Sequence, residues 1–200
     1  MRGRATRTEA IVNAALELAE RHGVAGVTTA TLAEQLDFTE PALYRYFPGK
    51  GAIIAAALHH TGERLFATMM LELLPEATQH GQKCEEQLAR HAKRFSLRGG
   101  LLLELVFWAA ATRDSVLQAA GSEFLHAYDQ RLIEYFGDLR ERGLTVSTLS
   151  PEDIARLWIC QLLGGFVRCR LGRERWDPVA NPGFRAFVAQ LQPASRAPAS

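Results

Sequence analysis

Apolar residues recur three or four positions apart along nearly the whole chain, and this spacing constrains the fold more than any other feature. Ile11, Ala15 and Leu18 show it early, and Ile54 and Leu58 continue it. Such spacing places apolar side chains on one face of a helix. Alternating β-branched runs between turn residues, which indicate strands, are nearly absent. We therefore predict an all-α protein.

Capping residues, glycines and prolines predict where the helices begin and end. Gly23 has the place of a left-handed residue that closes the first helix. The hydroxyls of Thr28 and Thr29 are suited to cap the start of the second helix. Ser150 and Pro151, followed by two acids, are typical of a helix start. About nine helices are predicted: one that ends near residue 22, and others near 29–36, 40–47, 50–74, 82–97, 101–112, 122–142, 151–171 and 184–191.

Helix length changes near residue 50, from short helices to long ones. The pattern predicts an N-terminal domain over residues 1–50 and a larger helical domain over 51–192. Residues 193–200 are rich in Pro, Ala and Ser, a composition typical of a disordered tail.

The charge balance is nearly neutral, with 23 basic and 22 acidic residues giving +1 at pH 7. No overall field therefore attracts nucleic acid, so binding to DNA would require locally concentrated charge. Arg2, Arg4 and Arg7 precede the first acid and form a compact basic arm. Such an arm can follow the DNA backbone or enter a minor groove. A solubilising disordered end is the alternative interpretation.

Several classes of protein are excluded by what the sequence does not contain. No apolar run approaches the ~18 residues of a membrane span, and the N-terminal residues lack the apolar core and cleavage site expected of a secretory signal. Three cysteines without CxxC spacing indicate reduced thiols and a cytoplasmic protein. Catalytic and cofactor motifs are absent, so we expect neither an enzyme nor a cofactor. His80 and Cys84 are spaced to chelate a metal, but no metal site is expected.

Two short predicted helices joined by a turn, residues 29–36 and 40–47, have the size and spacing of a helix-turn-helix. Another kind of small helical hairpin is the alternative. Leu43 and Phe47 of the second helix can face the core. The helix then places Tyr44, Arg45 and Tyr46 outside the core. Phenolic hydroxyls donate to phosphates, and guanidinium groups bind phosphate or guanine. This composition favours a DNA-binding surface.

The segment Ala42-Leu43-Tyr44-Arg45-Tyr46-Phe47 is followed by Lys50 and preceded by Thr28-Thr29, Leu32-Ala33 and Thr39. In spacing and residue type, residues 7–53 resemble the N-terminal DNA-binding domain of the TetR family of bacterial transcriptional regulators. The remaining helical length also resembles the family's divergent ligand-binding and dimerisation region.

The resemblance implies two sets of DNA-binding residues. Phosphate contacts would come from Thr28, Thr29, Tyr44, Tyr46 and Lys50. The residues nearest the bases would be Thr39, Glu40, Pro41, Ala42 and Arg45, and Arg4 and Arg7 of the basic arm complete the predicted site. In this arrangement the Glu40 carboxylate can accept from cytosine N4.

The sequence departs from the family pattern at three positions. Asp37 replaces the usual turn glycine, and an aspartate can still adopt a left-handed conformation at modest cost. Tyr46 replaces a histidine but keeps a donor. Gly51 replaces an acidic residue, which weakens the start of the helix that follows.

A single N-terminal domain, called the headpiece below, makes few contacts with DNA. The prediction therefore requires a homodimer that presents two headpieces to successive major grooves. The resemblance also places the interface on the last two long helices. The predicted interface residues are Leu157, Trp158, Leu162, Gly165, Phe166, Phe184, Phe187 and Leu191. Packing of this stripe within its own subunit is the alternative.

A pocket among the middle helices would bind a small, mostly apolar ligand, as the resemblance implies. The predicted lining consists of aromatic residues and polar anchors: His91, Phe95, Glu104, Phe107, Trp108, Phe124, Tyr128 and Gln161. Each aromatic residue can alternatively belong to the ordinary core.

These inferences predict a repressor that binds a palindromic operator as a dimer and is released by its ligand. A looser resemblance to the nucleoid-occlusion factors, a subgroup with the same fold, gives the alternative of a DNA-binding protein that acts through a cell-division protein. Its motifs are the headpiece and the segment around residues 160–178, with the basic residues Arg168, Arg170, Arg173 and Arg175.

Overall fold

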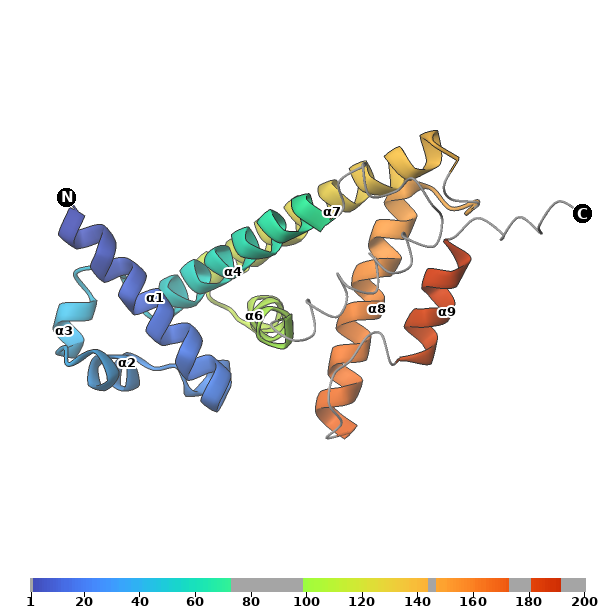
Figure 1. The fold of residues 1–200 in the computed structure, drawn as a ribbon. Helices are drawn as coiled ribbons and strands as arrows, with labels where there is room; N and C mark the ends of the chain where they lie inside the picture. The colour runs from blue at the N-terminus through green and yellow to red at the C-terminus, as the bar shows by residue number, and fades with distance from the viewer. Residues whose placement is uncertain (1, 73–98, 144–146, 173–180, 192–200) are drawn as a thin grey trace, which may run out of the picture. The chain divides into compact units, whose positions relative to one another are not determined.

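A computed structural model describes residues 2–72, 99–143, 147–172 and 181–191, and all regular secondary structure in these ranges is helical (Figure 1). The all-α prediction is therefore confirmed. The elements are α1 (Arg2–His22), the 3₁₀ turn η1 (Val24–Gly26), α2 (Thr29–Leu36), α3 (Glu40–Leu43), α4 (Lys50–Glu72), α6 (Gly99–Ala111), α7 (Ser115–Glu141), α8 (Pro151–Gly172) and α9 (Pro182–Gln190). The helix predicted at 82–97 lies outside the described residues.

The described residues fall into two compact units. The first comes from residues 1–64 and 101–125, and the second comes from residues 65–100 and 126–200. The first unit thus contains the first part of α4, nearly all of α6 and the start of α7 in addition to residues 1–50.

The first unit has a small apolar core between α1, η1, α2 and α3. α1 packs on η1 and α2, and α2 packs on α3. Its buried side chains include Ile11, Val27, Leu32, Leu43 and Phe47. The predicted inward face of the second short helix, Leu43 and Phe47, is therefore confirmed.

The turn between α2 and α3 confirms the interpretation of Asp37. This residue has φ 54° and ψ 44°, which is the left-handed conformation that a glycine usually supplies, and its N–H donates to the carbonyls of Ala33 and Glu34. An aspartate can therefore close α2 here without a glycine.

Gly23 also has a positive φ, 72°, but its ψ of 167° lies outside the left-handed helical region. The prediction of a left-handed closing residue is therefore correct only in the sign of φ. The chain turns directly into η1, where the N–H of Gly26 donates to the carbonyl of Gly23 at 3.0 Å.

α1 begins at Arg2, so the basic residues near the N-terminus are part of the first helix.

Two predicted boundaries are wrong. α3 ends at Leu43 and not at Phe47. A turn follows, in which the N–H groups of Tyr46 and Phe47 both donate to the Leu43 carbonyl. Pro48 comes next, and a proline disfavours a helical conformation of the residue before it. α7 begins at Ser115 and not near 122, because Asp114 caps it.

In the second unit α8 and α9 pack together around Trp158. The indole ring is buried and lies edge-on to Phe184, with centroids 5.1 Å apart, and its Nε1 donates to the Tyr128 hydroxyl at 3.0 Å. The predicted start of α8 is confirmed, since it begins at Pro151 and the Ser150 hydroxyl accepts from the N–H of Asp153 at 3.1 Å. Among the described helices, none combines the length and hydropathy needed to cross a membrane.

Candidate DNA-binding site

The start of α2 is fixed by a reciprocal cap. The Thr28 hydroxyl accepts from the N–H of Thr31 at 3.1 Å, and the Thr31 hydroxyl accepts from the N–H of Thr28 at 2.9 Å. This arrangement satisfies two of the N–H groups that a helix start leaves without intrahelical partners. The Thr28 side chain therefore holds the helix end whose remaining N–H groups can attract an anion.

The next residue, Thr29, connects α2 to α3. Its hydroxyl donates to Glu40 Oε2 at 2.6 Å, a length typical of a hydroxyl bonded to a charged carboxylate. Thr29 and Glu40 are the first residues of their helices. This bond therefore joins the two helix starts of the predicted helix-turn-helix.

α3 and the turn after it are amphipathic. Leu43 and Phe47 are buried, whereas Tyr44 is 53% exposed and Arg45 is exposed. The residues predicted to lie nearest the bases are also on the surface: Thr39, Glu40 and Pro41 are exposed, and Ala42 is half-buried. Tyrosine and arginine on an outward face can reach phosphates and base edges.

Tyr46 brings α1 to the same segment. Arg7 Nη1 donates to the Tyr46 hydroxyl at 3.2 Å, and the Tyr46 ring stacks on Phe38 with centroids 6.5 Å apart. The hydrogen bond raises the pKa of Arg7, so the guanidinium remains charged. A cation from the first helix and a phenol from the last turn of the motif thus lie together. The side chain of Arg4 is outside the described part of the structure.

Lys50 begins α4 and points toward the loop between α1 and α2. Its Nζ donates to the Ala25 carbonyl at 3.4 Å and lies 5.4 Å from the centre of the Trp108 ring. Partial burial lowers the pKa of Lys50. In this structure the predicted phosphate anchor therefore holds the loop and α6 together.

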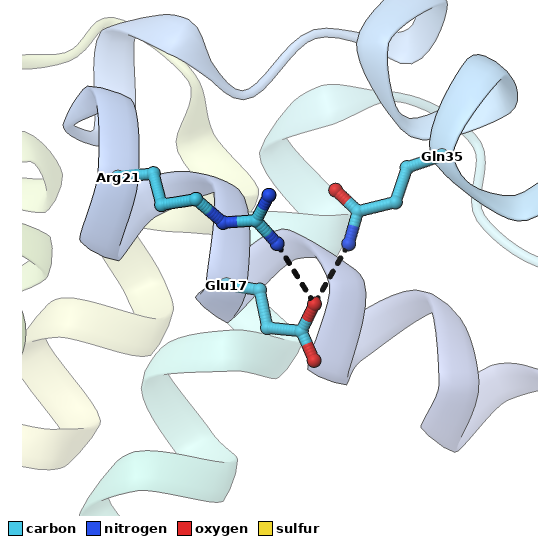
Figure 2. Close-up of polar contacts among 3 residues, drawn as sticks. All are labelled: Glu17, Arg21 and Gln35. Atoms are coloured by element: carbon cyan, nitrogen blue, oxygen red, sulfur yellow. Dashed lines mark hydrogen bonds and ion pairs between the residues drawn. The ribbon is translucent and has the colours of Figure 1, made fainter.

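Three polar residues that were not predicted fix α2 against α1. Figure 2 shows that Glu17 Oε2 accepts from both Arg21, at 3.2 Å, and Gln35, at 2.9 Å. The spacing of Glu17 and Arg21 is that of a helical ion pair and could have been read from the sequence, whereas Gln35 lies 18 positions away. All three are exposed, so the network orients α2 more than it stabilises the fold.

Glu104, predicted as a polar anchor for a ligand, has a structural contact. Its Oε1 accepts from the N–H of Val24 at 2.7 Å. A β-carbon at Gly23 would stand 3.0 Å from the same oxygen, so the glycine gives the carboxylate room. Through this contact α6 holds the loop that precedes α2.

The other predicted ligand residues have varied environments. Phe107 is 51% exposed, and Trp108 is half-buried beside Lys50. Phe124 is buried with its ring close to Gly62, and Tyr128 is bonded to Trp158. Gln161 is exposed on α8, and His91 and Phe95 lie outside the described residues, as do His80 and Cys84.

The predicted dimer residues lie mostly on the inner face of α8 and α9. Trp158, Leu162, Gly165, Phe166, Phe184, Phe187 and Leu191 are buried within the single chain, and Leu157 is 40% exposed. Within the single chain this stripe is therefore already covered, and among the predicted interface residues Leu157 is the exposed one.

Comparisons with known proteins support the interpretation of the motif. Residues 11–57 match the model of the bacterial regulatory proteins of the tetR family. Over 48 residues the chain is 46% identical to the class C tetracycline repressor protein of Escherichia coli. These 48 residues make up 24% of this chain and 22% of that protein.

Two further similarities extend over most of the chain. It is 28% identical over 168 residues to the nucleoid occlusion factor SlmA of Marinobacter nauticus, covering 82% of this chain and 85% of that protein. A TetR-family transcriptional regulator from Cytophaga hutchinsonii has the same fold, with a TM-score of 0.74 at 18% identity over 96% of this chain and 98% of the other. Residues 11–57 are therefore a DNA-binding segment of the tetR-family type, and the chain has the fold of the TetR-family transcriptional regulators.

Proposed function

We propose that the protein is a repressor that binds a palindromic operator as a homodimer in the cytoplasm and is released by a small, mostly apolar ligand. The observation that carries the DNA-binding part is the contact between Arg7 and Tyr46. It places a permanent cation from α1 beside the exposed face after α3, where phosphates would run along the motif.

The proposed contacts are divided between the backbone and the bases. Arg4, Arg7, Thr28, Tyr44, Tyr46 and Lys50 would serve the phosphates, and Lys50 would have to leave the Ala25 carbonyl to do so. Thr39, Glu40, Pro41, Ala42 and Arg45 would face the bases in the major groove. Phosphate contacts position the protein, and base contacts select the sequence.

For the homodimer we propose the outer face of α8 as the interface. Leu157, Gln161, Gly164, Arg168 and Leu171 follow one another at spacings of four and three, so they form one stripe along the helix. The stripe is exposed throughout, and Leu171 is 81% exposed. Two copies joined by this stripe would present two headpieces to one duplex.

Release by a ligand is supported by the similarity of the headpiece to a tetracycline repressor. α6 contacts the headpiece through Glu104 and Trp108, so a ligand that binds one position of α6 more tightly than another would shift the loop at Val24 and Ala25. A thermal-shift screen of hydrophobic metabolites tests this part. A ligand at 100 times its Kd should stabilise the protein by ~2.7 kcal/mol.

Electrophoretic mobility shifts with genomic fragments test the binding to DNA. Wild-type protein should retain a small number of palindromic fragments, and salt should weaken the binding. Tyr44→Ala and Arg45→Ala should abolish retention, whereas the control Arg142→Ala removes an exposed arginine of the second unit and should not. Equal retention by all four proteins would refute the assignment.

A second candidate function has its own support, since the similarity to a nucleoid occlusion factor extends over both units. Under this alternative the protein binds DNA and acts through a cell-division protein. Arg168 and Arg170, exposed on α8, belong to the surface that such a partner could use; Arg173 and Arg175 lie outside the described residues. Mapping bound sites on the chromosome separates the two: a repressor occupies a few promoters, and an occlusion factor occupies many dispersed sites.

A further inference from the structure

Thr29 and Glu40 form a short hydrogen bond, at 2.6 Å, and this bond connects two helices. Glu40 is exposed and Thr29 is half-buried. A hydroxyl that donates to a charged carboxylate at this length forms a strong, directional bond. The bond therefore restricts the rotamers of an otherwise mobile glutamate.

The hydrogen of Thr29 is committed to this carboxylate. A threonine hydroxyl has one hydrogen to donate. The neighbouring Thr28 hydroxyl is engaged with Thr31 in the cap of α2, so Thr29 supplies the link to α3. While Thr29 holds Glu40, it cannot also donate to a phosphate. The contribution of its side chain to binding must then act through Glu40.

A carboxylate held at the start of α3 has a narrow choice of partners in the major groove. An ionised carboxylate only accepts hydrogen bonds, and it retains further lone pairs beyond the one used by Thr29. Cytosine presents an amino donor in the major groove, whereas guanine presents two acceptors and thymine presents one. Adenine presents an amino group beside the acceptor N7, which repels a carboxylate oxygen. Cytosine is the base that satisfies the carboxylate without such repulsion.

We propose that Thr29 is a positioning residue that fixes Glu40, and that the pair selects a cytosine at one position of each half-site and rejects the other bases. The proposal rests on the proposed function, because it requires that α3 face the major groove. It replaces the phosphate contact implied for Thr29 with a role in specificity.

The experiment selects bound sequences from a randomised duplex library with the full-length protein and then measures affinities on single duplexes. Wild-type protein should prefer the selected cytosine over thymine at that position by about 10-fold or more. Glu40→Gln should move the preference to adenine, because a glutamine amide pairs with N6 and N7. Thr29→Val should reduce the preference for cytosine to about threefold or less.

Thr29→Ser is the matched control, because it keeps the hydroxyl and should keep the preference. Thermal melts of each variant show that the headpiece is folded. If Thr29→Val weakened binding to every duplex by one common factor, Thr29 would be a phosphate contact and the proposal would be wrong. An unchanged base preference in Glu40→Gln would also overturn it while leaving the DNA-binding function intact. Failure of wild-type protein to select any duplex would instead overturn the proposed function itself.

Discussion

The Asp114 carboxylate fills the space in which a β-carbon on residue 51 would stand. The same carboxylate begins α7, because its Oδ1 accepts from the N–H groups of Val116 at 3.0 Å and Leu117 at 3.1 Å. Gly51 replaces an acidic residue of the family pattern. The Asp114 carboxylate, from the connection between α6 and α7, supplies a negative charge beside the first turn of α4 in its place. A carboxylate near a helix N-terminus is favourable.

We therefore predict that Gly51→Ala destabilises the protein, although alanine is the better helix former. The methyl group would displace Asp114 and break the cap of α7, at a cost of about 1–2 kcal/mol. Urea denaturation measures the change. Gly137→Ala is the matched control, since its β-carbon would meet open space within α7, and it should stabilise by up to about 1 kcal/mol. An increase in stability for Gly51→Ala would show that the Asp114 contact is unimportant.

Glu104 should matter for the headpiece and not only for α6. Glu104→Ala would leave the N–H of Val24 without its acceptor and should cost about 1–3 kcal/mol, because Val24 is buried. Glu104→Gln keeps a carbonyl oxygen and should recover most of this loss. Denaturation followed by the ellipticity of the helices measures both variants. Equal stability of wild type and Glu104→Ala would contradict the role of this bond.

The Tyr128–Trp158 bond predicts a pH dependence. Burial raises the pKa of the Tyr128 hydroxyl above its ordinary value of about 10, and the hydrogen bond from Trp158 opposes this only in part. The folded state therefore holds the phenolic proton of Tyr128 more tightly than the unfolded state does. The contribution of this group to the free energy of unfolding is complete below pH of about 10 and is lost as the pH rises further. Tyr128→Phe should flatten the decline in stability above that pH.

The same variant has a second consequence at neutral pH. Without the phenolic oxygen, the buried Nε1 of Trp158 has lost its acceptor, which should cost about 1–3 kcal/mol. Thermal unfolding between pH 7 and pH 11, with tryptophan fluorescence as the readout, measures both effects. An alkaline decline as steep in Tyr128→Phe as in wild type would assign the decline to other groups.

Charge on the outer stripe of α8 should separate the proposed dimer. Leu157→Asp places a carboxylate on the exposed face without disturbing the buried Trp158. We predict a monomer by sedimentation and a loss of affinity for a palindromic duplex of about 100-fold or more, since one headpiece makes too few contacts. Val116→Asp, at a residue 52% exposed on α7, is the control and should stay dimeric. A dimeric Leu157→Asp would exclude this face.

Local rules predicted much of the headpiece, because its structure depends on neighbours in sequence. The cap at Thr28, the left-handed Asp37 and the burial of Leu43 and Phe47 each follow from one turn of chain. The start of α8 at Pro151 is predictable for the same reason. The end of α3 and the start of α7 were missed at this level, and Asp114 could have been recognised as the cap of α7.

Contacts between distant residues could not be predicted in the same way. Glu104 lies 80 positions from Val24, and Arg7 lies 39 positions from Tyr46, so no local pattern pairs them. The stripe at Trp158 has helical spacing whether its partner is α9 of the same subunit or a second copy. Periodicity reports that a face is buried, and it does not identify what buries it.

Arg7 and the exposed face after α3 form the proposed DNA interface, and the salt dependence of duplex binding shows whether Arg7 neutralises phosphates there. For a dimer that neutralises one phosphate with each Arg7, Arg7→Ala should reduce the slope of log K against log salt by about 1.8. Arg142→Ala, far along the sequence in the second unit, should leave the slope unchanged. A slope in Arg7→Ala equal to that of wild type would contradict the assignment of this surface to DNA.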